Sequence, residues 1–252
     1  MVTSFPIFIP KTDRLAKLSQ KFPHVITKLE TVFNKPTIVY IDFANVIPWS
    51  NKLKWNVDIK RLKQLLDSFS NIKKVRFYYG ELKDDARSKM ILSEAKKNSY
   101  DLNTKPVKII RQSINVSSIN MQSPDLLRQF ISRQFLTKLS IQDIEYFNNR
   151  LKDLNNSGTF ELLDKKCNFD VEIRGHMADD LKNKNIYNYA LWSGDCDFEE
   201  PIIKIVNSGK KFVVFGTRGA IARELANSGA YIYEVYSLKY FICFSKQIGF
   251  DI

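Results

Sequence analysis

The chain has 252 residues, 44% hydrophobic and 13% aromatic, which is enough apolar material for a substantial folded core. Lysine and arginine number 39 against 27 acidic residues, a net charge of +12 that favours polyanion partners, nucleic acid before an acidic membrane surface. The three cysteines lack the spacing of a disulfide framework or a zinc site, and no apolar run is long enough for a bilayer, so a cytoplasmic protein is expected.

The first hundred residues alternate between helical and strand patterns. After a proline-containing leader, apolar spacing predicts a helix over residues 12–33. Three β-branched, apolar runs then alternate with two amphipathic segments, a β-α-β-α-β order that implies a parallel sheet with helices on its faces. The predicted strands are residues 37–43, 73–80 and 106–112, and the predicted helices between them are residues 57–69 and 84–98.

The middle of the chain interrupts this alternation. Residues 123–140 open with Ser-Pro-Asp, which is typical of a helix start, and residues 140–154 repeat apolar side chains at helical spacing. The sequence Asn-Asn-Ser-Gly at 155–158 predicts a closing turn. We therefore expect an N-terminal helical extension over 1–35 and one α/β domain over 36–252, with a helical insertion near 120–156.

The alternation resumes after the insertion. Helices are predicted near 169–183, 198–208 and 220–227, strands at 188–193, 210–216 and 231–235, and a helix at the C-terminus. The predicted fold is a Rossmann-like, doubly wound parallel sheet flanked by helices.

Acidic residues stand at the ends of two predicted strands. Asp42 ends one, with Asn45 three residues on, and Asp195 and Asp197 follow another in the turn Gly-Asp-Cys-Asp-Phe. Ligands of open parallel sheets bind at these carboxyl ends, so we expect the acids to converge. Converging carboxylates raise each other's pKa unless a cation compensates, and Mg²⁺ prefers carboxylate oxygens. A helix cap would explain Asp42 equally well, whereas a second acid adds nothing to a cap.

Asp170 is a third candidate acid. It stands near the start of the predicted helix 169–183. There it could stabilise the helix dipole or point into the same site, and the spacing leaves both open.

Four segments, YIDFAN, CNFDVEI, LWSGDCDF and GKKFVVFG, resemble in order and spacing the NYN domain, a branch of the PIN-like nucleases, over roughly residues 36–236. The resemblance implies a Rossmann-like fold and a metal-dependent ribonuclease that uses Mg²⁺ or Mn²⁺. It implies a set of metal-binding acids supported by one asparagine: Asp42, Asp170, Asp195 and Asp197, with Asn45.

One position departs from the family pattern. Members commonly carry an aspartate six residues after the acid of the "DV" pair, where this chain has His176. An imidazole can bind Mn²⁺ or Zn²⁺ but suits Mg²⁺ poorly. Residues six apart on a helix differ by about 120° in direction, so Asp170 and His176 need not converge. Asp179 and Asp180 are nearby and could compensate if the helix register allowed it.

Basic and aromatic residues interleave just after the first acid. Trp49 and Trp55 alternate with Lys52 and Lys54, and aromatic faces stack on unpaired bases while lysines neutralise phosphates. Packing of both tryptophans against the core is the alternative. Arg218, in a loop that follows a strand and opens a helix, could hold a phosphate together with backbone N–H groups.

The sequence thus predicts a metal-dependent ribonuclease that acts on single-stranded or structured RNA through a metal-activated water. The alternative is a catalytically weak RNA-binding or assembly module that keeps the fold and the charge. The acids favour the nuclease, because a binding module has no use for Asp195 and Asp197. No membrane association is expected, and the oligomeric state stays open, with a homodimer as one option.

Overall fold

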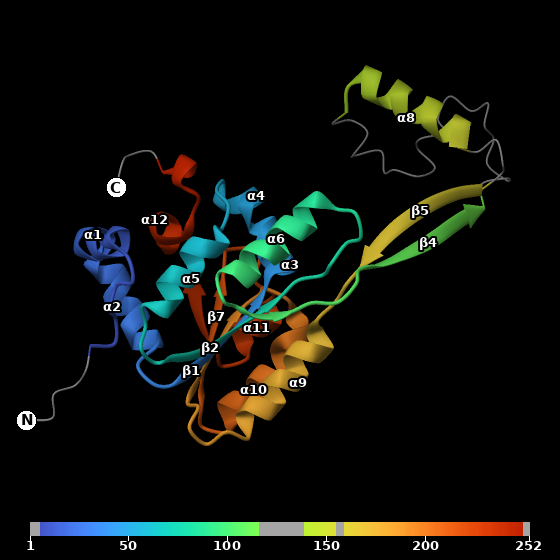
Figure 1. The fold of residues 1–252 in the computed structure, drawn as a ribbon. Coiled ribbons are helices and arrows are strands. Elements are labelled where there is room, and N and C mark those ends of the chain that lie inside the picture. Colours follow the sequence, from blue (N-terminus) through green and yellow to red (C-terminus); the bar gives the residue numbers. More distant parts are fainter. Residues whose placement is uncertain (1–5, 116–138, 155–158, 249–252) are drawn as a thin grey trace, which may run out of the picture. The chain divides into compact units, whose positions relative to one another are not determined.

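The computed structural model describes residues 6–115, 139–154 and 159–248. The chain divides into two compact units (Figure 1). Met1–Pro106 and Cys167–Ile252 together form what we call the sheet unit, and Val107–Lys166 form the insertion unit.

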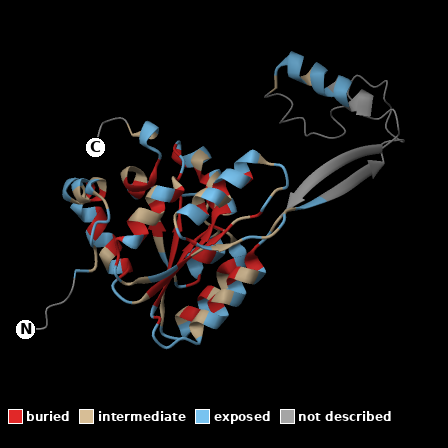
Figure 2. Ribbon diagram, in the orientation of Figure 1, coloured by how far each residue is buried: buried red, intermediate tan, exposed pale blue. Residues whose placement is uncertain are grey.

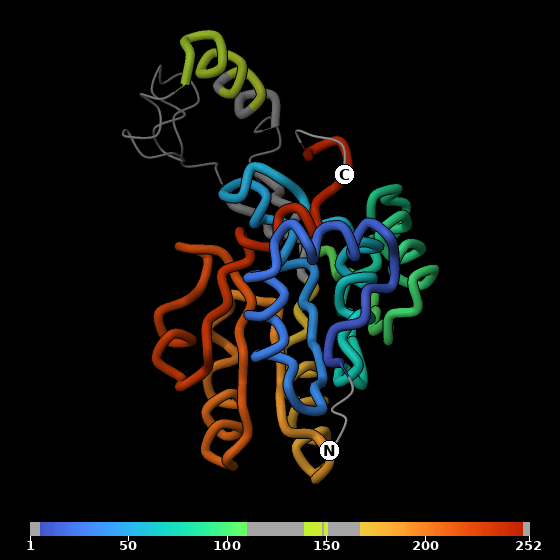
Figure 3. Tube along the Cα trace, turned by 90° about the vertical axis from the view of Figure 1, so that its left-hand side faces the viewer, coloured from blue at the N-terminus to red at the C-terminus, as the bar shows by residue number. Residues whose placement is uncertain are grey.

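The sheet unit is built on six parallel strands in the order β3-β2-β1-β6-β7-β8. The strand order reverses between β1 and β6, and both of these strands are buried along their whole length. In Figure 3 the blue β1 segment lies between the cyan-to-green segments and the orange-to-red ones, as this order requires. The strands are β1 Thr37–Asp42, β2 Ile72–Tyr78, β3 Asp101–Asn103, β6 Asn188–Trp192, β7 Lys211–Gly216 and β8 Tyr231–Glu234.

Helices cover both faces of this sheet, which confirms the predicted α/β fold. Alternate side chains of β1 enter opposite cores: Val39 and Ile41 on one face, Ile38 and Tyr40 on the other. Figure 2 shows the buried residues concentrated in the strands and in the helix faces against them. One face is covered by α1 Asp13–Lys21, α2 Pro23–Val32, α5 Ile59–Asp67, α6 Ala86–Lys97 and α12 Lys239–Ile242, and the other by α9 Asp170–Leu181, α10 Glu199–Asn207 and α11 Arg223–Asn227.

The predicted helix over 12–33 is two helices. Thr12 caps α1, accepting a hydrogen bond from the backbone N–H of Leu15, and α1 ends at Lys21. Pro23 then begins α2. A proline inside a helix lacks the N–H that the backbone ladder needs, whereas at the first helical position that N–H has no partner anyway.

The third predicted strand, residues 106–112, does not belong to the parallel sheet. The sheet continues instead with the three-residue β3, and the apolar run forms β4 Lys108–Asn115, which pairs antiparallel with β5 Thr159–Lys166 in a separate two-stranded sheet. A buried strand and a hairpin strand give the same apolar, β-branched pattern, so the pattern alone could not separate them.

The insertion unit also contains α8 Ile141–Leu154, close to the predicted helix over 140–154. The predicted helix over 123–140 lies outside the described residues except for its last two positions, and so does the predicted turn at 155–158. Within the ranges that the structure describes, no helix is long and apolar enough to cross a membrane.

Candidate metal centre

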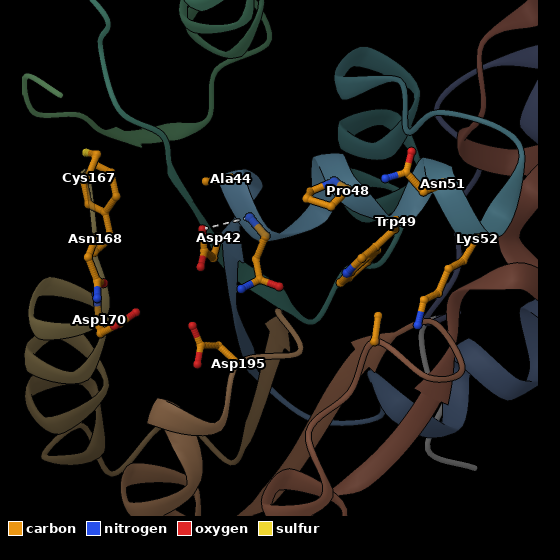
Figure 4. A pocket seen from close by; sticks show the side chains of 13 residues that line it. Asp42, Ala44, Pro48, Trp49, Asn51, Lys52, Cys167, Asn168, Asp170 and Asp195 are labelled. Carbon is orange, nitrogen blue, oxygen red and sulfur yellow. Dashed lines mark hydrogen bonds between the residues drawn. The ribbon is translucent and has the colours of Figure 1, made fainter. Parts of the chain in front are cut away.

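A pocket of about 470 Å³ opens beyond the ends of β1 and β6, where the strand order reverses (Figure 4). In open parallel sheets this switch point is where ligands bind. The lining brings together segments far apart in the chain: Asp42, Ala44, Asn45, Pro48, Trp49, Asn51, Lys52, Cys167, Asn168, Phe169, Asp170, Asp195 and Ala220.

Asp42 occupies the floor of this pocket at the end of β1. It caps the short helix α3 Phe43–Val46, its Oδ1 accepting a hydrogen bond of 3.4 Å from the backbone N–H of Asn45. The residue is only 8% exposed. The pKa of Asp42 is raised to about 7, mainly by burial and also by the charges of Asp170 and Asp195, against the lowering effect of the backbone hydrogen bonds. Asp42 is therefore both the cap of α3 and an acid of the pocket.

Asp170 stands at the first position of α9, its backbone N–H donating to Oδ1 of Asn168 at 2.7 Å. It is 7% exposed, and its Oδ2 has no hydrogen-bond partner among the described residues. Figure 4 shows its carboxylate directed toward Asp195. Burial raises the pKa of Asp170 to about 6; the Asn168 hydrogen bond lowers it, and the contact with Asp197 and the charge of Asp195 raise it.

Asp195 and Asp197 come from the turn after β6, in the 3-10 segment η4 Cys196–Phe198. Asp195 caps this segment, accepting a hydrogen bond of 3.2 Å from the backbone N–H of Asp197. Asp195 is partly buried and lines the pocket, whereas Asp197 is exposed and is not among the lining residues. The charges of Asp170 and Asp195 raise the pKa of Asp42, and those of Asp195 and Asp197 raise the pKa of Asp170, so the four predicted acids lie together at one edge of the sheet.

The glycine of the Gly-Asp-Cys-Asp turn is required by close packing. A Cβ on Gly194 would stand 1.8 Å from the carbonyl oxygen of Ala220, in the loop after β7. Gly194 also accepts a hydrogen bond of 2.9 Å from the N–H of Ala222 and donates one of 3.4 Å to Oδ1 of Asn45. Asn45 therefore connects the segment after Asp42 to the second acidic turn, and its support of a metal site stays a prediction.

His176 does not join the acids. Its Nδ1 lies 2.8 Å from the hydroxyl of Tyr78, and it is not among the residues that line the pocket. Burial and the charge of Arg76 lower the pKa of His176. Six residues after Asp170, the rotation of α9 directs the side chain of His176 toward β2. The prediction that His176 could be a metal ligand is therefore wrong.

Asp179 and Asp180, the nearby acids, do not replace the missing aspartate. Asp180 receives the hydroxyl of Tyr40 at 2.6 Å and the guanidinium of Arg76 at 3.0 Å. Asp179 is exposed and pairs with Lys182. Both acids are held by structural contacts.

Both tryptophans of the proposed RNA-binding segment are buried. Trp49 is 2% exposed and stacks on Trp192 at 6.2 Å between ring centroids, and Trp55 is 1% exposed. The prediction that bases stack on these rings is therefore wrong. The structure shows the alternative, in which both tryptophans pack against the core. An indole buries a large apolar area, which favours the core over a wet surface.

The predicted basic residues remain on the surface. Lys54 and Arg218 are exposed. Lys52 lines the pocket and donates a hydrogen bond to the carbonyl oxygen of Gly219, connecting the segment after α3 to the loop after β7. The role of Lys52, Lys54 and Arg218 in RNA binding stays a prediction.

Asn168 and Cys167 are among the pocket residues that sequence reasoning missed. Asn168 accepts a hydrogen bond from the backbone N–H of Asp170, and an Asn directly before the expected helix was the available signal, because such side chains form local turns. Cys167 also lines the pocket, and nothing in its local sequence marked it.

Acids gathered at the switch point of a Rossmann-like sheet define a candidate metal-binding α/β protein. A family model of the NYN domain matches residues 109–236, more than half of the chain, so the chain belongs to the NYN domain family of PIN-like nucleases. This match includes Asp170, Asp195 and Asp197 and begins after β1, so the role of Asp42 depends on the pocket geometry.

Among solved structures, the chain is similar to a protein of unknown function from Vibrio parahaemolyticus. The TM-score is 0.51 at 14% identity, over 82% of this chain and 96% of that one. At this identity the similarity shows the fold alone. No curated protein matches the chain.

Proposed function

We propose that this chain is a metal-dependent ribonuclease that hydrolyses RNA phosphodiester bonds with Mg²⁺ or Mn²⁺. One observation carries the proposal: Asp42, Asp170 and Asp195 converge on one pocket from three separate elements, and Oδ2 of Asp170 is buried there without a partner among the residues that the structure describes. A buried carboxylate oxygen without a donor is unfavourable unless a ligand completes it.

The donor set fits a hard divalent cation. Its atoms are carboxylate oxygens, the ligands that Mg²⁺ and Mn²⁺ prefer. Asp42, Asp170, Asp195 and Asp197 would hold the ion, which when bound supplies an activated water and offsets charge on the phosphate oxygens.

The protein groups contribute position and proton affinity. The pKa of Asp42 is raised to about 7 and that of Asp170 to about 6, so in the metal-free pocket these acids exchange protons near neutral pH. Asn45 fixes the acidic turn through Gly194, and Lys52 provides a cation at the pocket wall. The net charge of +12 supports a polyanionic substrate, and membership of the NYN family supports RNA.

Cleavage of labelled RNA by the full chain tests this function. Wild type is expected to cleave with Mg²⁺ or Mn²⁺ and to stop with EDTA. Asp195→Asn keeps the shape of the side chain and removes one charge, so cleavage should fall at least about a hundredfold while RNA binding persists. Asp179→Asn, an exposed acid outside the pocket, is the matched control and should cleave like wild type.

Two results would count against the nuclease. Cleavage that survives both EDTA and Asp195→Asn would exclude the metal site. Wild type that binds RNA but cleaves it with neither metal would favour the alternative, a catalytically weak RNA-binding or assembly module.

A further inference from the structure

Lysines gather around an exposed tyrosine at the edge of the sheet opposite the pocket. Tyr187 immediately precedes β6, and the ammonium groups of Lys35 and Lys210 lie 5.4 Å and 5.5 Å from its ring centroid. Lys35 comes just before β1 and Lys210 just before β7, the two neighbours of β6 in the sheet. Because these strands are parallel, all three residues stand at amino ends, away from the acids at the carboxyl ends. We call Lys35, Lys184, Lys210 and Lys211, with Tyr187, the amino-edge cluster.

Backbone hydrogen bonds fix the three segments that form this cluster. The N–H of Tyr187 donates to the carbonyl oxygen of Pro36 at 3.0 Å, and the N–H of Lys211 donates to the carbonyl oxygen of Tyr187 at 3.0 Å. The buried side chain of Asn188, the first residue of β6, donates to Oδ1 of Asn34 at 3.1 Å. The lysines are therefore attached to a rigid edge, so binding a ligand costs little ordering of the backbone.

The positive charge of the amino-edge cluster is not neutralised by acids. Among the residues that the structure describes, no ion pair includes any of its four lysines. The ammonium group of Lys210 donates instead to the carbonyl oxygens of Asn183 and Ile186. That of Lys211 donates to the carbonyl oxygen of Thr31 at 2.6 Å. An ammonium group has three donors, so within the described part of the chain each of these lysines keeps at least one for a further acceptor.

Lysines held this close together without acids are unfavourable. Lys35 and Lys210 share the ring of Tyr187, whose attraction for cations offsets part of their mutual repulsion. Lys211 is partly buried, and this burial lowers its pKa. An anion at this edge would relieve both the repulsion and the cost of burial, and phosphate oxygens are strong acceptors for ammonium donors.

We propose that the amino-edge cluster binds the sugar-phosphate backbone of RNA, as a second contact separate from the pocket. Neighbouring strands lie about 4.8 Å apart, so the chain segments of Lys35 and Lys210 stand roughly 10 Å apart across β6, a span that one flexible RNA strand can follow. The six residues of β1 extend over about 20 Å between this edge and the acids. An RNA that contacts both must therefore be long enough to pass around the sheet.

RNA fits this surface better than a membrane does. The flanking side chains Asn34, Asn183 and Asn185 are exposed and polar, unlike the bulky apolar residues that a membrane-binding surface inserts into lipid. Membership of the NYN family and the net charge of +12 favour nucleic acid as the polyanion. The choice of RNA rests on the proposed function; the affinity of the cluster for a polyanion does not.

Binding of a long single-stranded RNA in EDTA tests this without cleavage. Lys35→Gln/Lys210→Gln should weaken binding roughly tenfold at about 0.1 M salt, and the slope of log affinity against log salt should lose about 1.4, the share of two phosphate contacts. Lys96→Gln/Lys97→Gln, which changes two exposed lysines in the last turn of α6, is the matched control because it removes the same charge. It should leave the slope unchanged. Circular dichroism of each variant establishes that it is folded.

Cleavage with Mg²⁺ gives a second readout. In Lys35→Gln/Lys210→Gln the KM for long RNA should rise roughly tenfold with kcat unchanged, because the cluster does not touch the reacting phosphate. A dinucleotide substrate is too short to reach the amino edge, so wild type and both double variants should cut it equally. A loss of kcat on both substrates would show that the substitutions act on the pocket or the fold, and it would overturn the proposal.

The two proposals fail in distinguishable ways. If the chain is not a nuclease, no RNA is cut, and the salt slope in EDTA still falls in Lys35→Gln/Lys210→Gln. If the amino-edge cluster does not bind RNA, Mg²⁺-dependent cleavage remains, and the two double variants bind long RNA equally. Vesicles that contain phosphatidylserine are the remaining probe. Affinity for them that falls in Lys35→Gln/Lys210→Gln, while affinity for RNA does not, would overturn the assignment to RNA in favour of a membrane.

Discussion

The two ends of α9 carry acids in opposite circumstances. At its carboxyl end Asp180 receives the guanidinium of Arg76 at 3.0 Å and the hydroxyl of Tyr40 at 2.6 Å. At its amino end Asp170 has an oxygen with no partner in the described structure, and Asp195 and Asp197 add their own negative charge beside it. The negative charge of an aspartate on this helix is therefore compensated at the carboxyl end, and it is uncompensated at the amino end.

This difference distinguishes Asp180, whose charge stabilises the fold, from Asp170, whose charge a bound cation would compensate. The partners of Asp180 join α9 to β1 and β2, so its charge contributes to packing. Asp170 weakens the metal-free fold, because an uncompensated buried charge is costly. Local violations of the rules of stable packing concentrate at functional sites, and this supports the proposal of a cation at the amino end of α9.

The largest expected effect contrasts these two acids directly. Asp170→Asn should reduce RNA cleavage at least about a hundredfold and leave stability equal or higher, because it removes one repelling charge. Asp180→Asn should lower the free energy of unfolding by about 3 kcal/mol, because it leaves the Arg76 guanidinium without its bidentate partner. Cleavage assays and urea unfolding of both variants measure the two quantities. The comparison fails if Asp180→Asn loses activity while keeping its stability.

The second prediction uses the dependence of stability on pH. Asp42 has its pKa raised to about 7 in the folded chain from 3.8, so the folded state keeps this proton after the unfolded state has lost it. Stability of the metal-free protein therefore falls as pH rises from about 4 to about 7 and then levels off. Asp42→Asn should remove this loss, raising the free energy of unfolding by about 4 kcal/mol at pH 8 and by nearly nothing at pH 4.

Urea unfolding in EDTA at both pH values measures this, with Asp179→Asn as the control on a fully exposed acid. A gain from Asp42→Asn that is the same at pH 4 and pH 8 would show that shape rather than charge is responsible.

The sequence alone is sufficient to predict that the acids that follow strands come together. Buried, β-branched runs identify strands, and parallel strands end at one edge, so Asp42, Asp195 and Asp197 could be brought together without coordinates. For Asp170 the sequence leaves two roles open, because a carboxylate at a helix start can either stabilise the helix dipole or enter the site. Only its burial beside Asp197 shows that it also enters the site.

Other features depended on tertiary contacts that local patterns do not encode. The direction of His176 is set by the rotation of α9 against β2, where the hydroxyl of Tyr78 receives it. Trp49 and Trp55 alternate with lysines as a binding surface would, yet the fold supplies apolar neighbours that bury them. The run at 106–112 has the composition of a sheet strand, and its antiparallel partner lies some fifty residues away along the chain.

The third prediction concerns stabilisation by metal. Mg²⁺ or Mn²⁺ at roughly ten times its dissociation constant should stabilise the fold by about 1.4 kcal/mol, or about 3–6 °C in Tm for a chain of this length. The shift should be larger at pH 8 than at pH 5, because protons on Asp42 and Asp170 compete with the cation below their raised pKa values of about 7 and about 6.

Thermal unfolding with and without metal checks this, and Asp195→Asn should show little of the shift. A shift of equal size in Asp195→Asn would place the bound cation outside the acidic pocket.

The smallest expected effect concerns the surface charge rather than the acids. Lys54 is exposed just after the pocket-lining segment, at the end of the short helix α4 Ser50–Leu53. Lys54→Gln should weaken RNA binding a few-fold at moderate salt, and the slope of log affinity against log salt should lose about 0.7, the share of one phosphate contact on a single strand. Lys97→Gln, an equally exposed lysine at the end of α6, is the control and should leave the slope unchanged. Equal losses from both variants would mean that the net charge of +12, and not a localised path beside the pocket, attracts the RNA.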